Sequence, residues 1–173
     1  MLVAQPVTVY LSRFLSKRFL FNAGIIGWAF MSLTWITAGQ GEIVWVAAHL
    51  GINVPLGVPF ALRGFLWGMF NSVYLLMALS MLTDTIAFDQ KRTGQSRSGL
   101  YSGIFSAIEK VGFALGPAIA GIILSVGGFA GSKSGDVAAQ TPQAIATLTL
   151  AFCVYPAVVK VLGLLIFTRY REQ

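Results

Sequence analysis

Four long apolar segments, each containing few charged residues, alternate with short polar segments along this 173-residue chain. About 20 predominantly apolar residues in an α-helix cross the hydrocarbon core of a bilayer. A helix is required there because each segment must satisfy its own backbone hydrogen bonds in lipid. The pattern therefore predicts an all-α integral membrane protein with about four spans, at residues 19–38, 60–83, 98–128 and 145–168.

The segments between these runs suggest how the chain is organised. Residues 1–12 are interpreted as the remnant of a preceding helix, and residues 1–173 together as one partial domain. Residues 39–59 contain Trp45 among glycines and prolines, and we expect them at the outer interface, where Trp favours the headgroup region. Residues 84–97 are expected to form a polar inner loop that turns at Gly94.

The amino-acid composition agrees with a membrane protein. Charged residues make up 10% of the chain and hydrophobic ones 56%, whereas soluble domains carry about 25% charge. The net charge of +6 does not indicate a nucleic-acid partner, because that requires Lys and Arg gathered on one solvated face. The basic residues instead sit in alternate short loops: Arg13, Lys17 and Arg18, then Lys91, Arg92 and Arg97, and finally Arg169 and Arg171. This positive-inside bias predicts a multi-pass protein of the cell membrane with a cytoplasmic C-terminus.

No residue pattern indicates an enzyme. The lone Cys153 falls inside the last apolar segment, so neither a disulfide framework nor a Cys-based metal site is expected. The lone His49 has no second His or Cys nearby with which to hold zinc. A phosphate-binding glycine loop ending in Lys-Ser/Thr is also absent from the sequence. We therefore predict no catalytic residue, no metal site and no cofactor.

Ionisable residues inside the apolar segments are the candidates for function, because they are costly in hydrocarbon and normally face a cavity or a partner. A helix that begins near Ser98 would place Lys110 about 18 Å along it, near mid-depth of the bilayer. Ser106 lies four residues earlier on the same helical face, whereas Glu109 points about 100° away from Lys110. The alternative is that Glu109 pairs with another helix while Lys110 extends toward the interface.

Other polar and small residues in the segments have structural readings as well. Lys160 could line a cavity, extend toward the interface or pair between helices, and Arg63 could simply reach lipid headgroups. The spacings Gly64-x3-Gly68 and Gly112-x3-Gly116 fit the small-residue rule for close contact between membrane helices.

The run from Leu82 to Leu124 resembles a known family of transporters. Its shared features are Asp84, the pair Phe88-Asp89, Thr93-Gly94, Gly99, Lys110 and the small-residue helix that follows. Together they resemble helix 10, the 10–11 loop and helix 11 of the glycoside-pentoside-hexuronide:cation symporters. That family is the melibiose-permease-like branch of the major facilitator superfamily, whose members have twelve helices. The resemblance places this chain at the end of helix 8 through helix 12.

The resemblance also implies roles for individual residues. By the resemblance, Lys110 would lie beside the central cation and sugar sites, with Ser106 on the sugar side. Glu109 is kept as a third binding candidate because it is an ionisable residue inside the span. Asp84 would match an aspartate of the cytoplasmic gate, and we assign the nearby Asp89 and Arg97 to the same gate. The chain departs from the family where Ser96 and Ser98 replace Arg and Glu, where Arg97 is displaced by one position, and where Leu75 replaces an aromatic residue.

The leading hypothesis is the C-terminal portion of a cation- or proton-coupled symporter for a small solute, with a sugar as one candidate. Its partners would be that solute, sodium or a proton, the bilayer, and the N-terminal helices of a full transporter. The alternative is a membrane scaffold or assembly subunit that does not transport, in which Glu109, Lys110 and Lys160 only pair between helices.

Overall fold

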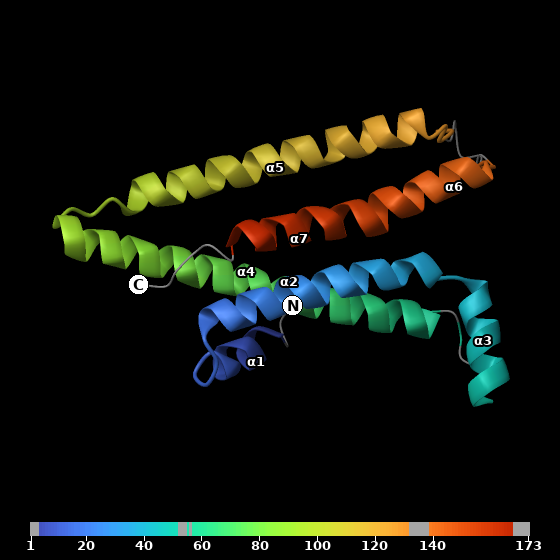
Figure 1. Cartoon of the computed structure of the whole chain (residues 1–173), viewed down its shortest axis with the longest axis horizontal. Coiled ribbons are helices and arrows are strands. Elements are labelled where there is room, and N and C mark those ends of the chain that lie inside the picture. Colours follow the sequence, from blue (N-terminus) through green and yellow to red (C-terminus); the bar gives the residue numbers. More distant parts are fainter. Residues whose placement is uncertain (1–3, 52–54, 56, 132–138, 168–173) are drawn as a thin grey trace. The chain divides into compact units, whose positions relative to one another are not determined.

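The computed structural model describes residues 4–51, 55, 57–131 and 139–167. Among these residues every regular element is a helix, and there is no strand (Figure 1). Residues 1–3, Thr168, Arg169 and Arg171, on which some of the predictions above depend, lie outside the described part. The elements are α1 (Ala4–Leu11), α2 (Lys17–Thr34) with a 3-10 turn (Trp35–Thr37), α3 (Gln40–Leu50), α4 (Gly57–Thr93), α5 (Ser98–Val126), α6 (Pro142–Thr149), a π-helical turn (Leu150–Val154) and α7 (Tyr155–Phe167).

Four helical segments are long and apolar enough to cross a membrane. They are Lys17–Thr37, Gly57–Thr93, Ser98–Val126 and Pro142–Phe167. The predicted all-α membrane architecture with four spans is therefore confirmed. This architecture follows from the length of the mostly apolar segments, because a bilayer requires about 20 apolar residues for each crossing.

The expected polar loop over residues 84–97 is wrong in extent. Helix α4 continues through Asp84 and Asp89, and the connection to α5 is only Gly94–Arg97. The segment that follows Ala87 contains neither Gly nor Pro before Gly94, so nothing in it interrupts helical hydrogen bonding. Gly94 adopts φ +71°, and its N–H donates to the Gln90 carbonyl at 2.9 Å. Asp84 and Asp89 are thus helical residues on the polar end of a helix about 55 Å long.

The chain forms two compact units, residues 1–78 with 152–173 and residues 79–151. In the first unit, α2 packs along α7. The Ser32 hydroxyl, which is buried, donates a hydrogen bond to the Cys153 carbonyl at 3.1 Å. The apolar residues buried in this unit are Leu20, Ile25, Trp28, Ala29, Met31, Met77, Cys153 and Ala157.

A wide turn interrupts the last span. The π-helical turn at Leu150–Val154 immediately precedes Tyr155 and Pro156. Proline cannot donate a backbone hydrogen bond and its ring clashes with the preceding turn, so a local widening there is expected. The carbonyl of Cys153 in this turn is the one that accepts from Ser32, which supplies an interhelical partner at the irregular turn.

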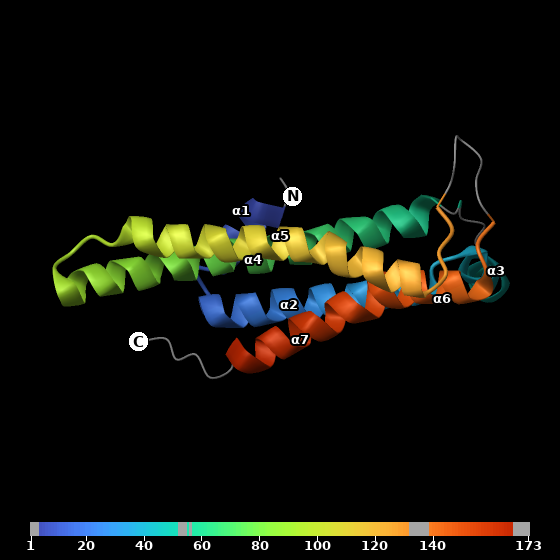
Figure 2. The ribbon, with the colours of Figure 1, turned by 90° about the horizontal axis from the view of Figure 1, so that it is seen from above.

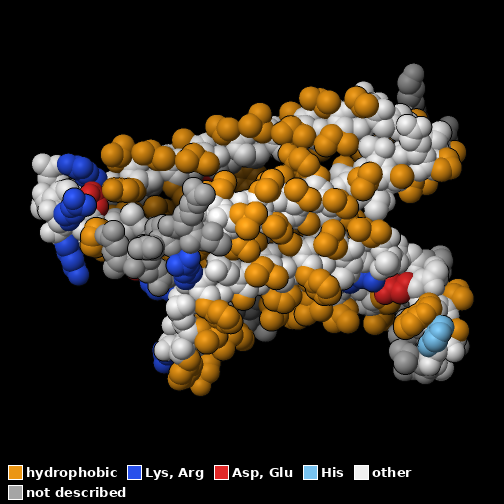
Figure 3. All heavy atoms as spheres, in the orientation of Figure 1, with side chains coloured by type: hydrophobic (Ala, Val, Ile, Leu, Met, Phe, Trp, Pro, Cys, Tyr) orange, Lys and Arg blue, Asp and Glu red, His pale blue; other side chains and the backbone are white. Residues whose placement is uncertain are grey.

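In the second unit, α5 and α6 make contact at their adjoining ends. Thr141 caps α6 by accepting a hydrogen bond from the Ala144 N–H at 3.2 Å, and Pro142 occupies the first turn. Helix α5 is continuous through Pro117 and has no buried residue along its length. Apolar side chains cover its visible face (Figure 3).

Close helix contact occurs at glycines that the spacing rule did not select. A Cβ atom on Gly24 would lie 2.8 Å from the Tyr74 backbone nitrogen, and one on Gly27 would collide with the Phe70 ring. At Gly64, Gly68, Gly112 and Gly116 such a Cβ would have no described atom within 4 Å apart from its chain neighbours and the nearby backbone of its own helix. The expectation that the two Gly-x3-Gly motifs mark contacts is therefore wrong within the described residues.

We expect Gly24→Ala to destabilise the first unit by about 1–3 kcal/mol, the usual cost of overpacking, because the added methyl meets backbone that cannot move aside easily. The melting temperature in detergent, followed by circular dichroism, measures this. Gly64→Ala is the matched control, since it adds the same methyl to open space on α4. Equal melting temperatures for the two variants would contradict the α2–α4 contact.

Candidate functional site

The predicted binding residues occupy the first half of α5. Lys110 is twelve residues after Ser98, so it lies about 18 Å along a helix about 43 Å long. Ser106 is one turn earlier on the same face, and Glu109 lies about 100° around the axis. All three side chains are exposed. The structure thus places an ammonium and a hydroxyl in one stripe, with a carboxylate beside them, in the middle of an apolar span.

The predicted gate residues lie near the turn between α4 and α5. Asp84 and Asp89 are on α4, five residues and therefore about 140° apart, so they face different directions. Arg97 immediately precedes α5, is exposed, and donates to the Gln95 side-chain oxygen at 3.1 Å. One carboxylate oxygen of Asp89, Oδ2, is buried and has no hydrogen-bond partner among the described residues. The turn Gly94–Arg97 brings Asp89 and Arg97 to the same end of their two helices.

Lys160 lies among aromatic rings in the first unit. Its Nζ is 3.3 Å from the centre of the Tyr74 ring and 4.2 Å from the centre of the Trp28 ring. Trp28 in turn lies against Trp67, with ring centroids 5.2 Å apart. The Lys160 side chain is partly buried, and Nζ has no hydrogen-bond partner among the described residues. A cation over ring faces gains about 2 kcal/mol when it is desolvated.

This aromatic cluster, consisting of Lys160, Trp28, Tyr74 and Trp67, joins α2, α4 and α7. It favours the pairing interpretation of Lys160, with aromatic rings rather than an acid as the partner. Sequence reasoning did not find these rings because the residues come from three separate helices. The sequence signal that could have indicated this cluster was weak: Lys160 lies in a span without an acidic residue, and other spans contain several aromatic residues.

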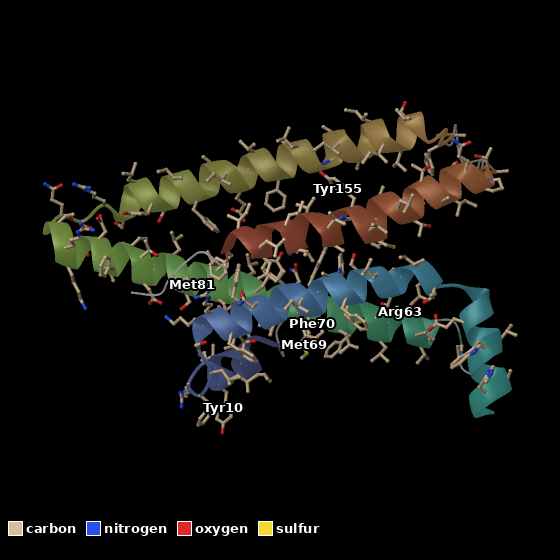
Figure 4. The ribbon with its side chains drawn as sticks, in the orientation of Figure 1. Tyr10, Arg63, Met69, Phe70, Met81 and Tyr155 are labelled. Carbon is tan, nitrogen blue, oxygen red and sulfur yellow. The ribbon has the colours of Figure 1, made fainter. Side chains whose placement is uncertain are left out.

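Arg63, which is labelled in Figure 4, makes a two-point contact with Glu42. Nη1 donates to Oε2 at 2.5 Å and Nη2 donates to Oε1 at 2.7 Å. Nη2 also lies 3.4 Å from the Thr37 hydroxyl oxygen. The expectation that Arg63 simply reaches headgroups is therefore wrong, because its guanidinium is engaged by a carboxylate on α3. Glu42 was not among the residues singled out from the sequence.

The described residues contain no group of three or more His, Cys, Asp or Glu side chains that could hold a metal ion. The ionisable groups described above instead occupy four separate settings. These settings are the exposed stripe on α5, the gate residues at the end of α4 and in the turn after it, the aromatic cluster around Lys160, and the ion pair between Arg63 and Glu42.

Four apolar spans with isolated ionisable groups define the chain as a multi-pass membrane protein. A family model described as MFS/sugar transport protein matches residues 1–171. The chain belongs to this family of the major facilitator superfamily. The resemblance of residues 82–124 to a family of transporters is thereby confirmed.

Two curated relatives support this membership. An uncharacterized symporter of Synechocystis sp. (strain ATCC 27184 / PCC 6803 / Kazusa), sll1374, is 28% identical over 135 residues, which are 75% of this chain and 25% of the relative. The Escherichia coli (strain K12) protein YagG, provisionally named a glycoside/cation symporter, is 30% identical over 99 residues, which are 57% of this chain and 20% of the relative. The chain thus matches a quarter or less of each relative's length. No solved structure gives a significant match.

Proposed function

We propose that this chain is the C-terminal portion of a cation- or proton-coupled symporter for a small solute, with sugars as the leading substrate class. The observation that carries the proposal is the family match over residues 1–171. The names of the two relatives, both of which include symport, point the same way. The transport would proceed by alternating access around a site near the middle of the bilayer.

The proposed binding site is the stripe on α5. The Lys110 ammonium offers three hydrogen-bond donors, and the Ser106 hydroxyl both donates and accepts, so together they suit a solute rich in hydroxyl groups. An ionised Glu109 carboxylate only accepts hydrogen bonds and carries negative charge, which suits a coupling cation or proton. Helix α5 has no buried residue, which is consistent with a helix that lines a cavity with one face.

The proposed gate is the end of α4 and the turn that follows it. Asp84, Asp89 and Arg97 would form and break charge contacts as the cavity opens and closes at the cytoplasmic side. The Oδ2 atom of Asp89 supports this role, because it is buried without a partner among the described residues and such a group needs a donor in at least one state.

The proposal also holds that the chain works together with further membrane helices. Alternating access moves one helical bundle against another, so the second wall of the site must come from helices that this chain does not contain. The match to 25% and 20% of the two relatives' lengths supports this part of the proposal. We expect such helices to be encoded directly upstream of the chain.

Reconstitution in liposomes tests this function. The purified 173-residue chain is expected to give no saturable, ion-dependent uptake of glycosides, whereas co-expression with the upstream helices should give uptake driven by a sodium or proton gradient. Saturable, gradient-driven uptake by the chain without those helices would overturn the proposal that it needs further helices for transport. Absence of uptake from the co-expressed assembly, with correct insertion of all helices, would overturn the symporter itself.

A second candidate function is a membrane scaffold that does not transport. Lys160 among its rings and Arg63 on Glu42 favour it, because both use ionisable groups to hold helices together. The two functions differ at Lys110, which contributes to solute or ion binding only in the symporter.

A further inference from the structure

Helix α3 runs crosswise to its neighbours within the first unit. Figures 1 and 2 both show it lying across the direction of α2, beyond the end of α2 that is opposite Lys17. Its 11 residues span about 16 Å, roughly half the thickness of the hydrocarbon core, so it cannot cross a bilayer. A short helix that turns sideways at the end of membrane spans has the geometry of an interfacial helix.

The Arg63–Glu42 ion pair holds α3 in this place. Glu42 lies in the first turn of α3, and Arg63 lies near the start of α4. Their side chains are only 22% and 12% exposed, and the two parallel hydrogen bonds make the contact directional as well as strong. The beginning of α3 is therefore attached to the end of a membrane span rather than suspended on a loop.

Beyond this attachment, the apolar side chains of Val44 and Trp45 are uncovered. Val44 is 68% exposed and Trp45 is 57% exposed. The Trp45 indole stacks on the His49 imidazole, with ring centroids 4.5 Å apart and 23° between planes, and His49 Nδ1 lies 2.9 Å from the Trp45 carbonyl oxygen. Figure 3 shows apolar side chains around the His side chain on this helix.

We propose that α3 binds the phospholipid headgroup region, lying in the plane of the membrane with Val44 and Trp45 at the boundary between headgroups and acyl chains. Paired rings with an apolar face and polar edge nitrogens suit this boundary, because one side contacts hydrocarbon while the N–H groups reach water and phosphate. The Arg63–Glu42 pair sets the depth of the helix. This inference does not depend on the transport function.

Depth measurement by spin labelling tests the proposal in the full chain reconstituted in phosphatidylcholine bilayers. A nitroxide is attached at Val44→Cys in a Cys153→Ala background, and its collisions with oxygen and with a water-soluble nickel chelate are compared. The controls are Ile26→Cys, an exposed site in the middle of α2, and Ser96→Cys, an exposed site in the turn after α4. We expect the Val44 label within about 10 Å of the headgroup boundary, as for other interfacial helices.

If water, hydrocarbon or protein surrounds α3 instead of headgroups, the Val44 label is expected to give different accessibilities. Nickel contact as high as at Ser96 would place α3 in water, a depth equal to that of Ile26 would place it in hydrocarbon, and low contact with both probes would mean that protein covers it. Each of these results overturns the proposal. In a second variant, Arg63→Met, we expect the Val44 label to become more mobile and its depth to spread, whereas an unchanged spectrum would overturn the role of the ion pair.

Discussion

Replacing Lys110 with alanine is expected to abolish coupled uptake by the transport-competent assembly while leaving membrane insertion intact. An ammonium at mid-depth costs about 2.5–3.5 kcal/mol on insertion scales, so its removal does not impair insertion. It does remove the central cation of the proposed site and the donors that it offers to solute. Lys110→Arg keeps the charge but changes its shape from a compact point to a planar fork, so we expect only partial recovery.

Gradient-driven uptake by vesicles that contain equal amounts of inserted protein measures this effect. Lys91→Ala is the control, because it removes the same type of cation from the exposed polar end of α4. The scaffold function predicts a different pattern: loss of Lys110 would strand an acidic partner and lower thermal stability, and removal of that acid would restore it. Uptake by Lys110→Ala with unchanged solute affinity and ion dependence would refute the proposed site.

Lys160→Ala is expected to lower the stability of the first unit by about 2 kcal/mol, the lower end of the usual cost of truncating a long core side chain, because Lys160 is only partly buried. The lysine stem and ammonium fill the space between α2, α4 and α7, with Nζ over the rings of Tyr74 and Trp28. Lys160→Met preserves most of this volume and removes a charge that has no hydrogen-bond partner among the described residues. We therefore expect the methionine variant to be about as stable as the original protein.

Thermal melting of the two variants in detergent separates the contribution of side-chain volume from that of the charge. Tryptophan fluorescence reports on the melting because Trp28 and Trp67 belong to the cluster. Val159→Ala is the control, since Val159 precedes Lys160 and is 48% exposed. A methionine variant that melted at as low a temperature as the alanine variant would contradict stabilisation by packing. In that case the charge of Lys160 over the rings, rather than the volume of its side chain, would stabilise the unit.

The order of residues was sufficient to predict that the chain spans a membrane and which family it resembles. The first prediction follows from one constraint, because a segment that crosses hydrocarbon must be about 20 residues long, apolar and helical. The second follows from a run of about 40 residues between Leu82 and Leu124 whose features are contiguous in the chain. The side of the membrane on which each loop lies, and the roles of Lys110, Ser106 and Glu109, stay predictions.

Which residues touch one another became clear only from the folded chain. Gly24 and Gly27 approach α4 although they have no x3 spacing, whereas the better motif at Gly64 and Gly68 has open space around it. Small residues permit close contact, but which face of a helix meets its neighbour depends on the packing of whole helices. A short sequence pattern does not contain that information.

The same limit applies to the charged side chains. Lys160 over Tyr74 and Trp28, and Arg63 on Glu42, join residues 21 or more positions apart in the chain. The sequence marked both cations as unusual because charge is costly near hydrocarbon. Their partners could be identified only from the arrangement of the helices in space, because these residues become neighbours through folding and not through proximity in sequence.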